Sequence, residues 1–561
     1  PYLCFLCLFV LGTLFTVCKG TSVGEDISAQ VLSTQHFISG KINSPNIVLA
    51  PSNNDLSRNT AIWHIRPPGA SWFALPGMFL GLEIGNAIKF SLVLIGLLGG
   101  IGWLKLSNKL GVRKQGLIYL SLLLGLSIGL TTNRLGTMNS TLFAIVPWML
   151  LWAIQISAQD LQNKRNIFKS VVLIAFFYLL LGCFCLIKMS GLIVALTVGF
   201  VPVLLVYLKK TALRKNILLL ILVILAPIIL FPANELKRFN LYNLGFNSHD
   251  LYTKQNYNQQ SFLWGEHFVE STKGKMLLLS ALGSPGYALP IKPLIHSARD
   301  FSLQFESFID WSRDNKVNAH VFVCGIFGII TLSLFITVIR KNRMLFSSLS
   351  LKIFSTFCVI PFLGLAILSN LHGFNYSLYA THTIEYSILL LLPMILVWES
   401  SQLSSLAYKA FVSLLLALPV LKIIDLAPTT INEGFISTTE SERGLSSSRF
   451  SEAIEYIESD SNSELDIIYF LPAGDSGDLV LRSKMRTMTR HFAGYNFHQH
   501  LNFKTSKKLN VYLAYDEKLS EIPEFIKATS ERFPNSTQEE TTLKGGITVK
   551  KIKLFPTPSV S

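Results

Sequence analysis

The sequence predicts a polytopic α-helical membrane protein that ends in a small α/β domain. Half of the 561 residues are hydrophobic, 15% are charged and the mean hydropathy is +0.44, a balance that is unusual for a soluble protein. Apolar runs of about 17 to 25 residues recur along the chain, as membrane-spanning helices require. From Ala427 the composition becomes polar, and helix and strand patterns alternate.

The apolar runs predict about eleven spans in a membrane domain covering residues 1–426. The spans are expected at 1–18, 84–104, 115–131, 140–157, 170–187, 191–208, 216–232, 319–339, 353–369, 385–398 and 410–426. Two long polar loops, 19–83 and 233–318, interrupt them. The second loop is too long for a plain connector and is rich in aromatic residues, so we expect it to fold onto the membrane surface.

The net charge of +15 predicts the orientation of the spans. Residues 427–561 contain 16 basic and 18 acidic residues, a balance of −2, so the positive excess lies in the first 426 residues. It falls in four short loops on one side, which is the positive-inside pattern. We therefore expect a cytoplasmic N-terminus, an extracytoplasmic C-terminal domain in the cell (inner or plasma) membrane, contact with membrane lipids, and no nucleic-acid partner.

The cysteines bear on disulfide formation, and the first residues bear on the start of the first span and on a signal peptide. All seven cysteines lie within or at the ends of apolar spans, so no disulfide framework is predicted. The chain begins with Pro1 rather than Met, so we expect the first span to be cut short. A signal peptide is the alternative interpretation of residues 1–18, although neither a basic n-region nor a small-residue cleavage site is visible.

Residues 427–561 are predicted to form an extracytoplasmic α/β domain after a linker at 429–449 that is rich in Ser, Thr and Glu. Helix patterns occur at 449–459 and 520–532, and strand patterns at 465–472, 509–515 and 547–555.

An acidic pair, Glu25 and Asp26, follows the first span and is the catalytic candidate. Ser22 and Glu25 have the spacing of a capping box, so helix capping alone accounts for Glu25. Capping does not require Asp26, although a second acid in a first turn is common. A helix expected at 27–39 would hold Asp26 at the mouth of the bundle. There a carboxylate can act as general base on an acceptor hydroxyl, or stabilise charge developing on a sugar ring.

The same loop ends in the run RPPGASWFALPG, residues 66–77. Pro67 and Pro68 fix the backbone, Gly69 permits a close approach, and Trp72 suits the membrane interface. The alternative is a simple turn before the second span.

An acid-bearing first outer loop with a helix and a Gly after it, then PPG and LPG before the second span, resembles the GT-C fold glycosyltransferases that use lipid-linked sugars. The resemblance is to the bacterial branch similar to protein mannosyltransferases and aminoarabinose transferases. The long outer loop after the seventh span and the trailing outer domain are also similar to that family's layout. The resemblance implies an inverting sugar transfer from a polyprenyl phosphate, with Asp26 matching the catalytic aspartate of the first loop.

The implied leaving group is a lipid phosphate, which needs positive charge nearby. The outward-facing candidates for binding it are Arg66, Arg134, Lys188, Lys292 and Arg299. Each of them can also be an interfacial residue whose charge snorkels to the headgroups.

The chain departs from the family pattern in two places. Relatives often carry a second acid in the next outer loop, where this chain has Arg134, so we predict no metal and no cofactor. Near the tenth span the family often shows an Arg-Tyr pair ahead of a Pro. Here the run is THTIEYSILLLLP, so His382 and Glu385 are the substrate-binding candidates there, with an interfacial position as the alternative.

Two motifs in the α/β domain are weaker indications of a binding site. The run HFAGYNFHQH contains three His residues but no Cys or carboxylate at metal-ligand spacing, which favours a solvated turn. PAGDSGD follows a predicted strand but lacks the Lys-Ser/Thr of a phosphate-binding loop.

The sequence thus favours a cell-envelope membrane glycosyltransferase that moves a sugar from a polyprenyl-phosphate donor to a lipid, glycan or protein acceptor on the outer side. The alternative is a transporter or flippase for a lipid-linked glycan. Such proteins tend to have charged or broken helices near the midplane and related halves, and neither is evident. A scaffold whose outer domain binds a partner leaves Asp26 and the PPG turn unexplained.

Overall fold

In a computed structural model the chain divides into two compact units. The first comprises Pro1–Thr16, Leu92–Asn234 and Asn256–Asn432, and the second Val17–Ser91, Glu235–Gln255 and Glu433–Ser561. The structure describes residues 1–17, 72–82, 84–131, 137–158, 167–187, 191–207, 221–222, 333, 336–337, 340, 347, 349–354, 356–357, 360–361, 364, 384–399, 413, 416–417, 447–471, 483, 485–489, 505–516, 537–544 and 546–556.

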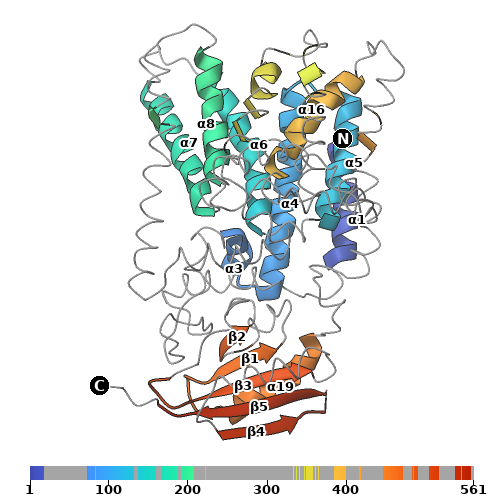
Figure 1. The fold of residues 1–561 in the computed structure, drawn as a ribbon. Coiled ribbons are helices and arrows are strands. Elements are labelled where there is room, and N and C mark those ends of the chain that lie inside the picture. Colours follow the sequence, from blue (N-terminus) through green and yellow to red (C-terminus); the bar gives the residue numbers. More distant parts are fainter. Residues whose placement is uncertain are drawn as a thin grey trace, which may run out of the picture. The chain divides into compact units, whose positions relative to one another are not determined.

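The first unit is helical (Figure 1). Its described helices are α1 (Tyr2–Val17), α4 (Ile84–Lys109), α5 (Lys114–Thr131), α6 (Thr137–Ala158), α7 (Ile167–Ile187), α8 (Gly191–Tyr207) and α16 (Ile384–Glu399), with the first turns of α4 belonging to the second unit. Each of these helices lies at a predicted span. The predicted spans at 216–232, 319–339, 353–369 and 410–426 lie largely outside the described residues.

One helix in the described part of the chain, Asn86–Lys109, is long and apolar enough to cross a membrane. Shorter apolar helices occur at Tyr2–Leu14, Thr141–Ser157, Val171–Phe184 and Gly191–Leu205. A buried helix of a soluble protein meets the same criterion, so the number of spans stays a prediction.

Glycines let α4 pack closely against two other helices. A Cβ at Gly99 would lie 3.0 Å from Ala144 Cα on α6, and one at Gly100 would lie 2.1 Å from the Phe5 ring on α1. The fully buried Trp103 adds a hydrogen bond from its indole Nε1 to the Phe143 carbonyl on α6, at 3.0 Å. Small residues of this kind allow helix backbones to approach each other. They bring α4 into close contact with α6 and α1.

The C-terminal part is a five-stranded mixed sheet with α19 (Ser447–Asp460) on one face (Figure 1). The strands are β1 (Ile467–Leu471), β2 (Arg486–Thr489), β3 (Leu509–Asp516), β4 (Thr537–Thr542) and β5 (Ile547–Leu554), in the order β2-β1-β3-β5-β4. β1 pairs in parallel with β2 and β3, whereas β5 is antiparallel to β3 and β4. Phe450, Ile454 and Ile457 of α19 pack on buried residues of the sheet.

The sequence predicted α19, β1, β3 and β5, and missed two strands. β4 reads TQEETT and every one of its residues is exposed, so it has no apolar alternation to detect. β2 has only four residues. The helix predicted at 520–532 lies outside the described residues, and the domain boundary at 426/427 stays a prediction.

Candidate functional site

The predicted site residues lie almost entirely outside the part of the chain that the structure describes. Those outside are Glu25, Asp26, Arg66, Arg134, Lys188, Lys292, Arg299 and His382. Glu385 is the exception for its backbone, which lies in the first turn of α16. Of the sequence features proposed to form the site, the structure describes the LPG motif, which ends the first polar loop.

The LPG motif forms α3 (Leu75–Phe79), a short helix packed against the start of α4. A Cβ at Gly77 would lie 2.4 Å from the Ala87 carbonyl oxygen and 2.5 Å from the Ala87 Cα, so only glycine fits. The Gly77 amide donates to Ser91 Oγ at 3.1 Å, and Ser91 is buried. This contact and hydrogen bond hold the end of the loop against the first turns of α4.

The turn after α3 exposes apolar side chains. Phe79 is 75% and Leu80 63% exposed, and Trp72 at the other end of the segment is 36% exposed. Gly81, with φ +70°, reverses the chain before α4 begins. Tryptophan is enriched at membrane interfaces, and Trp72 stays the residue of this segment that the sequence predicts to lie there.

A second polar contact links α16 to the turn between α4 and α5. The Glu399 carboxylate accepts hydrogen bonds from the Arg113 amide at 2.8 Å and the Gly116 amide at 2.6 Å. A carboxylate at a helix N-terminus satisfies free amides and interacts favourably with the helix dipole. Sequence reasoning missed this role of Glu399. The available signal was a lone acid at the end of an apolar span.

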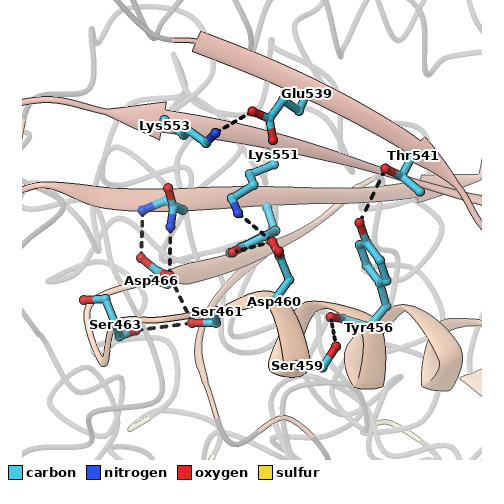
Figure 2. A network of polar contacts seen from close by, with 12 residues as sticks. Tyr456, Ser459, Asp460, Ser461, Ser463, Asp466, Glu539, Thr541, Lys551 and Lys553 are labelled. Carbon is cyan, nitrogen blue, oxygen red and sulfur yellow. Dashed lines mark hydrogen bonds and ion pairs between the residues drawn. The ribbon is translucent and has the colours of Figure 1, made fainter.

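The best-described polar cluster is in the α/β domain (Figure 2). Asp460 ends α19, and its Oδ2 accepts hydrogen bonds from Lys551 Nζ at 2.6 Å and from the Tyr512 hydroxyl at 3.0 Å. The hydrogen bond from Lys551 lowers the pKa of the Asp460 carboxyl. Burial, followed by the bond to Asp460, raises the pKa of the Tyr512 phenol. Asp460 is thus kept ionised and Tyr512 protonated, which suits an anchor for α19 better than an acid–base pair.

A neighbouring carboxylate, Asp466, is buried just before β1. It accepts hydrogen bonds from the Asn510 amide at 2.8 Å, from Asn510 Nδ2 at 3.0 Å and from Ser461 Oγ at 3.0 Å. Asp466 and Asn510 lie at the amino ends of the parallel strands β1 and β3. Ligands of open α/β sheets bind at the opposite, carboxyl ends, so this network is structural.

No group of three or more His, Cys, Asp or Glu side chains that could hold a metal ion occurs among the described residues. The prediction that the chain uses no metal and no cofactor is not tested by this finding, because the first polar loop lies largely outside those residues.

Comparisons with known proteins assign no family. No family model matches the chain, and no curated protein sequence matches it. The crystal structure of ArnT from Cupriavidus metallidurans in the apo state aligns over 98% of this chain and 97% of its own, with 11% identity and a TM-score of 0.42. The same protein bound to undecaprenyl phosphate aligns over 98% and 96%, with 11% identity and a TM-score of 0.37. TM-scores this low do not establish a shared fold or an activity.

Proposed function

We propose that the chain is a membrane glycosyltransferase that uses a polyprenyl-phosphate-linked sugar donor on the outer side of the membrane. The observation that carries the proposal is the first polar loop, in which the Glu25-Asp26 pair follows one apolar span and the PPG and LPG motifs precede the next. The packing of Gly77 on Ala87 supports it, because this contact anchors the end of that loop to a long apolar helix.

In the proposed reaction an acceptor hydroxyl attacks the anomeric carbon of the donor sugar, and the bond from that carbon to the lipid phosphate oxygen breaks. Asp26 takes the hydroxyl proton as general base. The phosphate leaves with its negative charge, which a cation must stabilise. Arg66 is a candidate because it precedes the PPG turn in the same loop, and Arg134, Lys188, Arg299, His382 and Glu385 are the further candidates for binding substrate.

A single displacement of this kind inverts the configuration at the anomeric carbon. It requires no metal, since a fixed cation can meet the charge of the leaving phosphate. The acceptor is a lipid, glycan or protein with a free hydroxyl.

The test is to follow the sugar and the lipid of one donor separately. The purified chain is placed in proteoliposomes with a polyprenyl-phosphate sugar labelled in the sugar, together with a membrane extract as the source of acceptors, and the polyprenyl phosphate is followed by its mass. A transferase moves the label to an acceptor and releases unglycosylated polyprenyl phosphate. A transporter moves the intact labelled lipid between leaflets, and that result would contradict the proposal.

A further inference from the structure

The turn between α4 and α5 carries a cluster of exposed cations, which we call the basic turn: Lys105, Lys109, Arg113 and Lys114. No acidic residue occurs between positions 84 and 131. Within the part of the chain that the structure describes, the carboxylate that reaches this turn is that of Glu399, and it binds the backbone amides of Arg113 and Gly116. The basic turn therefore keeps an excess of positive charge.

Another helical segment, which carries Ser350 and Lys352, meets the same turn and adds to its positive charge. Ser350 Oγ donates a hydrogen bond to the Leu110 carbonyl at 2.6 Å. This bond places the segment that carries Lys352 against the basic turn. Lys105 is held on one side, with its Nζ 5.0 Å from the centroid of the Trp148 ring. The cations are thus collected at one end of several packed helices.

An exposed apolar stripe leads away from the basic turn along α5. Lys114, Ile118 and Leu122 are spaced four residues apart, so their side chains lie on one face of the helix. Ile118 is 38% and Leu122 39% exposed. On α4, Leu98 is 46% exposed and lies seven residues before Lys105. This surface is cationic at the turn and apolar beside it.

We propose that the basic turn binds the headgroups of anionic phospholipids, with Lys109, Arg113 and Lys114 at the phosphate and the Ile118-Leu122 stripe along an acyl chain. An anionic lipid matches both parts of the surface. A soluble anion would pair with the cations but leave the apolar stripe uncovered. The headgroup of a zwitterionic lipid carries a cation of its own, which would lie beside the cations of the basic turn. The inference rests on one part of the proposed function, namely that the chain lies in a membrane. It does not depend on sugar transfer.

The experiment measures how lipids change the thermal unfolding midpoint of the full-length chain purified in a neutral detergent. The chain is titrated with phosphatidylglycerol, with phosphatidylcholine of the same acyl chains, or with inorganic phosphate. The test variant combines Lys109→Gln, Arg113→Gln and Lys114→Gln, which leaves the backbone amide of Arg113 available to Glu399. The control combines Lys507→Gln, Lys508→Gln and Lys544→Gln, which removes equal charge from exposed positions of the α/β domain.

Phosphatidylglycerol is expected to raise the midpoint of the native chain and of the control at lower concentrations than phosphatidylcholine does. In the test variant the concentration of phosphatidylglycerol needed for the same rise should increase at least about tenfold, because three surface cations are lost. A variant with Lys109→Arg and Lys114→Arg should behave as the native chain.

Equal effects of the two lipids, an unchanged response in the test variant, or a full rise with inorganic phosphate would overturn the inference. If the test variant does not fold, the single variants Lys109→Gln and Lys114→Gln are each compared with the native chain. If the native chain shows no selectivity for phosphatidylglycerol but still transfers sugar, this inference alone is contradicted. Selectivity without any transfer contradicts the proposed function alone.

Discussion

At the scale of single residues, Gly77 shows how the LPG motif works. Its Cα faces the backbone of Ala87 so closely that no side chain fits, and its amide binds the buried Ser91 hydroxyl. Glycine is therefore required at this position by packing, since α3 and the start of α4 share one contact. The motif fixes where the first polar loop ends.

Replacement of Gly77 by Ala should destabilise the chain. The added methyl group would overlap the Ala87 backbone, and overpacking of this kind typically costs about 1 to 3 kcal/mol. The measurement is the thermal unfolding midpoint in detergent. Gly81→Asn is the control, because Gly81 has open space around it and Asn tolerates its positive φ. Equal stability of Gly77→Ala and the native chain would contradict the packing argument.

Asp460 makes the attachment of α19 dependent on pH. Its pKa is lowered in the folded state, chiefly by the Lys551 hydrogen bond. The stabilisation is therefore fully present above the unfolded pKa of about 4 and is lost as the pH falls through the lower folded value. Because Asp460 is partly exposed, the contribution is small.

The expected result is that Asp460→Asn speeds hydrogen exchange in α19 at pH 7 and has little effect near pH 2. Native and variant full-length chains are compared at the same pH, so that intrinsic exchange rates cancel. Glu464→Gln, an exposed residue outside the cluster, is the control. A difference between native chain and variant that is as large near pH 2 as at pH 7 would show that Asp460 does not act through its charge.

At the scale of elements, Glu399 joins the end of α16 to the start of α5. One carboxylate caps two amides of a helix more than 280 positions earlier in the chain. Gly116 makes room for it, because a Cβ there would lie 3.0 Å from Glu399 Cδ. The contact holds the basic turn in place without using its cationic side chains.

Glu399→Ala should therefore lower the thermal unfolding midpoint, with a cost of about 1 to 2 kcal/mol from the lost cap. Glu399→Gln, which keeps one acceptor oxygen, should cost less. The midpoint is followed by the circular dichroism of the helices, with Glu464→Ala as the exposed control. If Glu399→Ala unfolds at the native midpoint, the cap does not contribute to stability.

Elements differ in how far the sequence could predict them. β3 and β5 were predictable because apolar residues recur on their buried faces. β4 was not, because its six residues are all exposed and it gains its structure from pairing with β5. Apolar length predicted the helices at the spans, but it could not predict that Glu399 caps α5, because that contact depends on which helix ends meet.

At the scale of the whole molecule, the site prediction depends on the first polar loop. Chain order predicts that Asp26 follows one apolar segment and that Gly77 precedes the next. The contact of Gly77 with Ala87 was not predictable, since it requires the backbone path of α3. Spacing alone also leaves the choice of the phosphate-binding cation open, because residues such as Arg66 and Arg299 are far apart in the chain.

The most direct measurement of the central claim is sugar transfer by membranes carrying the native chain or Asp26→Asn. The donor is a radiolabelled polyprenyl-phosphate sugar, expression is matched, and Glu540→Gln on the exposed strand β4 is the control. Loss of the general base should reduce transfer at least about a hundredfold, while the control labels its acceptor as the native chain does. Equal labelling by the native and Asp26→Asn membranes would contradict the catalytic role of Asp26.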